Sequence, residues 1–421
     1  MNVVGNIASA YSPPFKVVVK YFIAGIGSFF LLNLLLLLNY DYISGHHFQP
    51  KILSLTHIAT LGWITMIIFG AMIQLVPVVL EVKLFSARLA EIQFWIFVIG
   101  IIGLVYKFWH FNSVISFTIP AILLNLSMYI FIFNIVATMK SVKIWNITGT
   151  YLASALFYLF VTAIAGLLLA INLDSPYIKI NHLQYLNLHA HVAFIGWVSM
   201  VVMGVTYKLI PMFTLSHDFK LLFAKVAFVL INIGLLGISI IMHYSQMSIF
   251  YFVFVPMIAI GIFFFLIQVI IIFKKRIRKK FDVGIKFSSF AYTVLGITTL
   301  LGLVIAFIDY QSIINLTLIY GYLIIFGYLS MLIVGQMYKI VPFLVWYNKY
   351  SSKVGFEKVP MLKDMFNEKI ALVGFYLMIL AIILVVISYI FQFRHLLLFS
   401  FSLMFLSSLL FAVNMIKIFR S

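Results

Sequence analysis

Residues 191–211 read HVAFIGWVSMVVMGVTYKLIP, and the same pattern occurs twice more along the chain. Residues 57–77 read HIATLGWITMIIFGAMIQLVP, and residues 322–342 read YLIIFGYLSMLIVGQMYKIVP. In each copy a leading His or Tyr is followed at identical intervals by Gly, an aromatic residue, Met, Gly and Pro. Chance does not preserve five fixed intervals in three segments, so the pattern predicts an internal threefold repeat.

Composition indicates a membrane protein. The chain of 421 residues is 65% hydrophobic and 9% charged, and its mean hydropathy is +1.18. A soluble domain cannot bury that much apolar surface, which predicts a polytopic membrane protein. Cysteine is absent, which excludes disulfides, iron–sulfur clusters, thiolate zinc sites and covalently attached haem. A metal would have to be bound by His, Met, Tyr or carboxylate side chains.

Twelve apolar runs are long enough to cross a membrane as helices. Together with the three copies of the pattern, they predict an all-α integral membrane fold of three pseudo-symmetric four-helix repeats. The repeats are expected at residues 1–142, 143–283 and 284–421, within a single transmembrane domain that covers the chain. The patterned helix is the second helix of each repeat.

Basic residues predict the topology. When successive connections are assigned to alternate sides of the membrane, 24 of the 28 Lys and Arg residues fall on the side of both termini. By the positive-inside rule both termini are cytoplasmic, as in a multi-pass protein of the cell (inner) membrane. The basic block at residues 274–280 is interpreted as an anchor beside anionic lipid. The lipid bilayer is therefore an expected partner, and nucleic acid is not.

Histidines are the main candidates for function. Nine of the ten are placed in outer connections or in the outer halves of helices, and only His217 is placed on the cytoplasmic side. Three of them, His57, His189 and His191, lie inside patterned helices, where a histidine is costly and by default functional. The others are interpreted as solvated residues of the outer connections: His46, His47, His110, His182, His243 and His395.

The leading histidines suggest a haem site. His57 and His191 occupy equivalent positions, and neutral imidazole is the common ligand of haem iron and copper. Two imidazoles from facing helices are what a six-coordinate haem requires. His189 precedes His191 by two residues, a rotation of about 200° on a helix, so it serves a second site or another purpose. The alternative is that all three histidines are structural hydrogen-bonding groups.

The small residues of the pattern also admit two interpretations. Its glycines allow close approach either of a neighbouring helix or of a flat macrocycle: Gly62, Gly70, Gly196, Gly204, Gly327 and Gly335. Its prolines are expected to end each helix on the inner side: Pro77, Pro211 and Pro342.

The third copy lacks histidine. Tyr320 and Tyr322 replace the positions of His189 and His191, and we expect them to pack or donate hydrogen bonds rather than ligate iron. Buried carboxylates are scarce too, since Asp309 lies at an outer helix end and no span carries a central Asp or Glu. This argues against a proton-coupled transporter built on acids inside the membrane.

The segment from His189 to Pro211, HAHVAFIGWVSMVVMGVTYKLIP, resembles the haem-binding helix of haem–copper oxidase subunit I, particularly the cbb type. In that family an H-x-H pair ligates two haems from opposite faces of one helix. Twelve helices in three pseudo-repeats are also typical of it. The tandem pattern is similar as well to NnrS-type membrane proteins, which contain haem and copper and are linked to the nitric-oxide response.

The resemblance implies residue roles and cofactors. His191 would correspond to the low-spin haem ligand, His189 to the high-spin ligand and His57 to the low-spin ligand of helix 2. One or two b-type haems are implied, with copper as a further candidate cofactor. The chain departs from the family because its H-x-H pair lies on helix 6 rather than helix 10. The adjacent His-His pair of the copper site and the crosslinked Tyr–His pair are not found.

The expected function is electron transfer, or binding or reduction of O2 or NO, near the outer membrane face. An enzyme of this kind would be an oxidoreductase of the cytochrome oxidase or nitric-oxide reductase type, with cytochrome c or another redox subunit as electron source. One alternative is a non-catalytic haem- or copper-handling or transport protein on a degenerate oxidase fold. Another is a structural subunit that has lost its cofactors.

Overall fold

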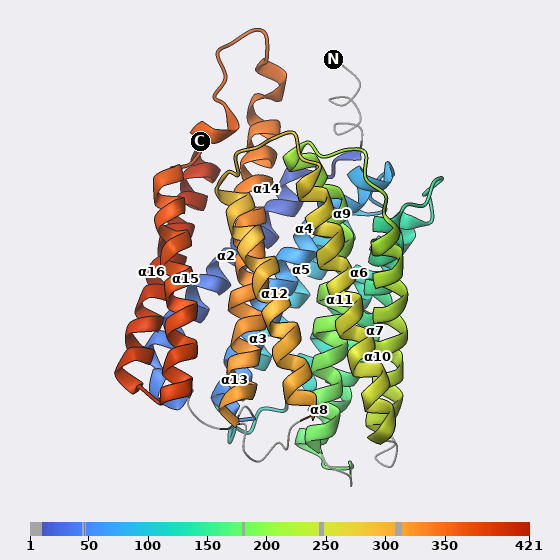
Figure 1. Cartoon of the computed structure of the whole chain (residues 1–421), viewed down its shortest axis with the longest axis vertical. Helices are drawn as coiled ribbons and strands as arrows, with labels where there is room; N and C mark the ends of the chain where they lie inside the picture. The colour runs from blue at the N-terminus through green and yellow to red at the C-terminus, as the bar shows by residue number, and fades with distance from the viewer. Residues whose placement is uncertain (1–10, 44–45, 47, 179–181, 244–247, 308–313) are drawn as a thin grey trace. The chain divides into compact units, whose positions relative to one another are not determined.

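Helices account for the regular structure of the chain. The structure, a computed structural model, describes residues 11–43, 46, 48–178, 182–243, 248–307 and 314–421 (Figure 1). Within these residues, twelve helical spans are long and apolar enough to cross a membrane. The predicted all-α, multi-pass membrane protein with twelve spans is therefore confirmed.

Nine spans are single α-helices, and three are composite. The single helices are α2 (Phe15–Leu38), α5 (Ala87–Trp109), α6 (Thr118–Met139), α7 (Ile147–Asp174), α10 (Leu222–His243), α11 (Tyr251–Lys274), α12 (Val283–Phe307), α15 (Glu368–Phe391) and α16 (Arg394–Arg420). The composite spans join α3 (Pro50–His57) to α4 (Met66–Leu80), α8 (His182–His191) to α9 (Met200–Thr214), and α13 (Ile314–Tyr322) to α14 (Met331–Tyr350).

Each composite span contains a π-helix between its two α-helices. The π segments are η2 (Ile58–Thr65), η3 (Val192–Ser199) and η6 (Leu323–Ser330), and each begins directly after the leading residue of the pattern. In a π-helix the backbone bonds join residues five apart. The leading residue and the glycine five positions later therefore lie on similar sides of the span. The sequence pattern had indicated helix without this local change of winding.

The helices group into two compact units. The first contains Met1–Tyr21 and Ile68–Lys279, and the second contains Phe22–Ile67 and Lys280–Ser421. In the first unit α5 packs on α6, α6 on α7, α7 on η3 and α9, and α10 on α11. In the second unit α12 packs on η6 and α14, and α15 packs on α16. Two of the unit boundaries fall inside α2 and α4 rather than at the expected ends of repeats.

Close helix packing accounts for several glycines of the pattern. A Cβ atom on Gly196 would lie 2.5 Å from Cγ of Tyr158 on α7, and one on Gly327 would lie 2.8 Å from Cγ1 of Val294 on α12. In the first copy, a Cβ on Gly62 would lie 3.0 Å from Oγ of Ser28 on α2. The neighbouring helix thus occupies the space that these glycines leave.

The prolines do not end the helices, contrary to expectation. Pro77, Pro211 and Pro342 lie inside α4, α9 and α14. The carbonyl of Pro77 accepts a hydrogen bond from Val82 N, and that of Pro211 accepts one from Ser216 N, both at 3.0 Å. The residues just before these donors, Glu81 and Leu215, have positive φ. Such a bond across a left-handed residue is the Schellman ending, which places the helix terminus one turn beyond the proline.

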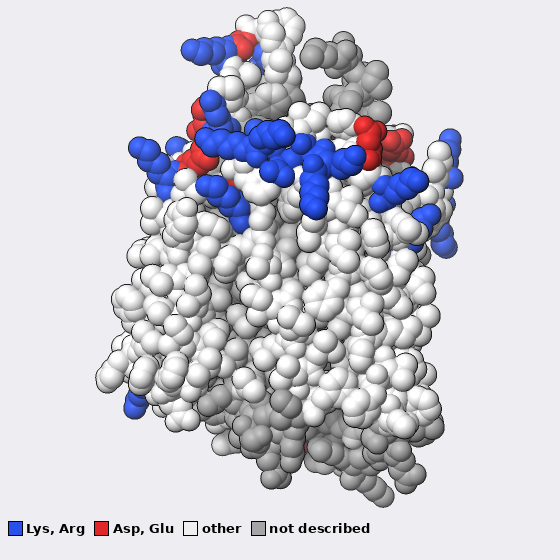
Figure 2. Space-filling model, viewed as in Figure 1, with Lys and Arg blue, Asp and Glu red and all other residues white. Residues whose placement is uncertain are grey.

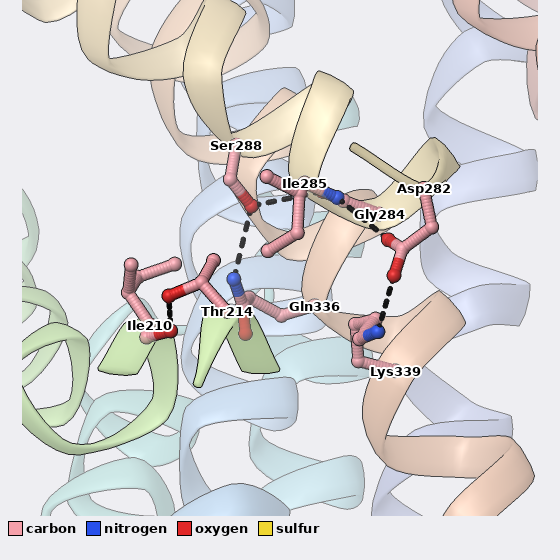
Figure 3. Close-up of polar contacts among 8 residues, drawn as sticks. All are labelled: Ile210, Thr214, Asp282, Gly284, Ile285, Ser288, Gln336 and Lys339. Carbon is pink, nitrogen blue, oxygen red and sulfur yellow. Dashed lines mark hydrogen bonds and ion pairs between the residues drawn. The ribbon is translucent and has the colours of Figure 1, made fainter. Parts of the chain in front are cut away.

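Charged side chains gather at the helix ends. Lys and Arg cluster where α11 leads to α12 and where α14 ends, and an apolar surface covers the helices beyond them (Figure 2). In the second unit, Lys339 Nζ lies 2.6 Å from Asp282 Oδ2, and Asp282 Oδ1 accepts a hydrogen bond from Ile285 N at 3.1 Å (Figure 3). Gln336 Nε2 donates to Ser288 Oγ at 3.0 Å one turn further along. These bonds tie the start of α12 to α14.

Replacing Gly335 with alanine should loosen this pair of helices. The new Cβ would lie 2.6 Å from the carbonyl oxygen of Gly284 on α12, and a backbone atom cannot move aside as a side chain end can. We expect the variant to lose about 1–3 kcal/mol of stability, measured as a lower unfolding temperature in detergent. Gly27→Ala is the matched control, because nothing lies within 4 Å of its Cβ position. Equal stability of the two variants would contradict the close approach.

Candidate functional site

The two leading histidines make the same hydrogen bond. His57 is the last residue of α3, and its Nδ1 lies 2.7 Å from the carbonyl oxygen of Leu53. His191 is the last residue of α8, and its Nδ1 lies 2.7 Å from the carbonyl oxygen of Asn187. A carbonyl oxygen can only accept, so Nδ1 must carry the proton in both rings. In the neutral imidazole the lone pair is then on Nε2.

Both rings also keep part of their surface exposed. Both are only partly buried, although the residues that follow them, Ile58 and Val192, are buried. A histidine that binds a metal usually donates its other ring N–H to a carbonyl or carboxylate, which fixes the tautomer and the ring plane. Leu53 and Asn187 supply this bond through their backbones. His57 belongs to the second unit and His191 to the first.

His189 is placed differently from His191. Its ring packs against α7, where a Cβ atom on Gly166 would lie 3.1 Å from its Cε1. Tyr320 packs against α12 in the same way, 3.1 Å from the Cβ position of Gly302. His189 and Tyr320 each lie two residues before the leading residue of their copy. The ring of each therefore packs over a glycine of the single helix that precedes it in the chain.

In the third copy the side chain at the leading position, Tyr322, is buried. Tyr322 is 9% exposed, and its ring stacks on Phe326 with centroids 4.6 Å apart. Its hydroxyl oxygen is buried. The ring thus fills its own surroundings, whereas His57 and His191 keep part of their surface exposed. Packing, the expected role of Tyr322, agrees with this geometry.

An aromatic residue follows the glycine in each π segment. Trp63 of η2 is fully buried, stacks on Phe29 with centroids 4.6 Å apart, and donates from Nε1 to Ser330 Oγ of η6 at 3.0 Å. This bond joins two π segments within the second unit. Ser330 was not singled out from the sequence, because a serine within a span gives no signal of its partner.

Several histidines at or near the helix connections have local contacts. Asn172 Nδ2 lies 2.8 Å from His182 Nδ1, His46 Nδ1 accepts from Phe48 N at 3.2 Å, and the rings of His110 and Tyr106 lie 4.7 Å apart. His47 and Asp309 lie outside the described residues, and so does the side chain of His243.

The donor set suits haem better than a copper centre. Among the residues that the structure describes, no three or more His, Cys, Asp or Glu side chains come together as a metal site. Haem iron requires only one or two protein ligands, and a single imidazole with a fixed Nδ1–H provides one.

Comparison of the chain with models of known protein families gives no match. Comparison with curated proteins gives none either.

A double-mutant cycle tests the bond between the π segments. Trp63→Phe and Ser330→Ala each remove one partner of the Nε1–Oγ hydrogen bond. We expect a coupling of about 0.6 kcal/mol, the usual value for a side-chain hydrogen bond inside a membrane protein, in unfolding measured in detergent. Additive losses would mean that the two side chains do not interact.

Proposed function

We propose that the chain is a haem-binding membrane protein similar to haem–copper oxidase subunit I. It would transfer electrons, or bind or reduce O2 or NO, near the outer membrane face. The observation that supports this proposal is the shared hydrogen bond of His57 and His191, which places the proton of each ring on Nδ1 and its lone pair on Nε2. Equivalent sequence positions make two equivalent imidazoles, as a haem protein of this kind would need.

The proposed layout is three pseudo-symmetric four-helix repeats with both termini cytoplasmic in the cell (inner) membrane. Three π segments of eight residues at one position of the pattern support it. The repeated packing of the third helix on the fourth, α5 on α6, α10 on α11 and α15 on α16, supports it too. The clustering of basic residues supports the orientation.

In this proposal His57 and His191 would hold b-type haem through Nε2, and His189 would hold a second haem. Bound haem would supply a one-electron redox centre or a site for a diatomic gas. Leu53 and Asn187 would hold the two imidazoles in the ligating tautomer through their carbonyl groups. The surrounding apolar spans would exclude water. Electrons would come from cytochrome c or another redox subunit.

A second candidate function is non-catalytic handling or transport of haem or copper on a degenerate oxidase fold. The burial of Tyr322 favours it, because the third copy would then have lost a ligand and have a packed aromatic ring at that position. Under this reading haem would be bound without turnover.

The decisive measurement is a reduced-minus-oxidised pyridine haemochrome spectrum with copper analysis on purified protein. We expect one or two b-type haems per chain, and loss of haem in His57→Ala and His191→Ala because each removes an Nε2 ligand. Copper in comparable amount would favour catalysis, and vesicles that accumulate haem or copper would favour transport.

Tyr322→Phe is the matched control, since it changes the equivalent position without removing a proposed ligand. It should retain the haem of the unchanged protein. A preparation without haem after haem-replete expression, or full haem content in both histidine variants, would refute the proposal.

A further inference from the structure

The connection between α14 and α15 presents a large apolar side chain to solvent. Phe356 is 90% exposed, and Val354 and Met361 are 51% and 58% exposed. We refer to residues 353–361 as the tip. Exposed apolar residues on the spans face lipid, but an aromatic residue on a connection has no such reason to be exposed, and apolar residues gathered there suggest an interaction site.

The tip is a structured turn. Gly355 has φ of +89°, a left-handed conformation that suits glycine. The backbone N–H groups of Phe356 and Glu357 both donate to the carbonyl oxygen of Lys353 at 3.0 Å. Lys353 Nζ also lies 3.1 Å from Glu357 Oε2. These bonds set the backbone that carries Phe356.

Further contacts fix the two ends of this connection next to the helices. Trp346 Nε1 donates to the carbonyl oxygen of Pro360 at 2.7 Å, so the returning chain lies against α14. Met365 is 1% exposed and anchors the return to the helices. Lys349 Nζ donates to the carbonyl oxygen of Phe419, at the end of α16, at 3.1 Å. Phe356 is therefore displayed on an element with a defined shape, at little further cost in ordering.

The tip lies beyond the end of α14, about three turns past the first charged residue of that helix. Lys339, paired with Asp282, marks the level where charged groups begin on α14, and the helix continues to Tyr350. Eleven residues at about 1.5 Å each carry the chain about 16 Å past Lys339. The headgroup layer on each side of a bilayer is only about 5–8 Å thick. With the headgroups at the level of Lys339, Phe356 would lie outside the bilayer that its own spans cross.

The charge around Phe356 is positive. Residues 349–364 contain four lysines, Lys349, Lys353, Lys358 and Lys363, against Glu357 and Asp364, and Lys353 is paired with Glu357. The whole chain has 28 Lys and Arg against 10 Asp and Glu, so a second copy offers little negative surface to meet them. An acidic partner would be attracted and oriented by this charge.

We propose that the tip is a docking site for a separate protein with an acidic surface around an apolar pocket that receives Phe356. An aromatic anchor within a charged rim is the usual composition of such an interface. The inference does not depend on haem binding, because neither His57 nor His191 takes part in it.

The test uses the full-length protein with the photoreactive residue p-benzoylphenylalanine in place of Phe356, in membranes of cells that naturally make the protein. Illumination should give an adduct with one acidic protein. Its yield should fall about tenfold in the charge-reversed double variant Lys358→Glu with Lys363→Glu, which leaves the Lys353–Glu357 pair intact, and also in about 0.5 M salt. The matched control is Lys279→Glu with Lys280→Glu, which makes the same change of charge elsewhere and should leave the yield unchanged.

A second control places the photoreactive residue at Val114, which is fully exposed on another connection and should not give the same adduct. The proposal is overturned by adducts with lipid alone, by adducts with a second copy of the chain, or by the absence of any adduct. It is also overturned by a protein adduct whose yield does not respond to charge reversal at the tip.

Discussion

A bilayer offers no hydrogen-bond partner, so every backbone N–H and C=O group of a span must be satisfied within the protein. α-Helices meet this requirement, and the twelve spans follow from it. The π segments η2, η3 and η6 meet it with bonds to the fifth residue instead of the fourth. Because the shift is the same in each, the leading residue keeps one orientation relative to the glycine that packs on the neighbouring helix.

The backbone of these spans also accepts hydrogen bonds from the leading histidines. The carbonyl groups of Leu53 and Asn187 lie one turn before the π segments and accept the ring N–H of His57 and His191. In water such a bond would compete with solvent, but inside an apolar span it has few competitors and fixes the ring. Local helix geometry thus determines which ring nitrogen carries the proton, while in the third copy the same position serves aromatic packing between Tyr322 and Phe326.

The sequence predicted the number of spans and the helical state of all three patterned segments, because apolar length and fixed spacing determine both. It did not predict the π segments, although the interval of five from His57 to Gly62 carried a signal: in an α-helix these residues would lie on different sides. The predicted helix ends at Pro77 and Pro211 were wrong. Each helix continues one turn further and ends at a left-handed residue, Glu81 or Leu215, and the sequence does not mark these ends because neither residue is glycine. The hydrogen bonds of His57 and His191 depend on side-chain rotamers, which spacing does not determine, and their proposed role with haem stays a prediction.

The equal length of the three π segments also bears on the history of the chain. A π-turn contains one residue more than an α-turn, so each segment can be regarded as an α-helix with an inserted residue. If the three copies descend from one ancestral helix, a single insertion before the duplications accounts for all three segments, whereas later insertions would have had to recur independently at the same site. The irregular winding would then be older than the difference between His57, His191 and Tyr322, and the leading side chains would have diversified on a backbone that already had this shape.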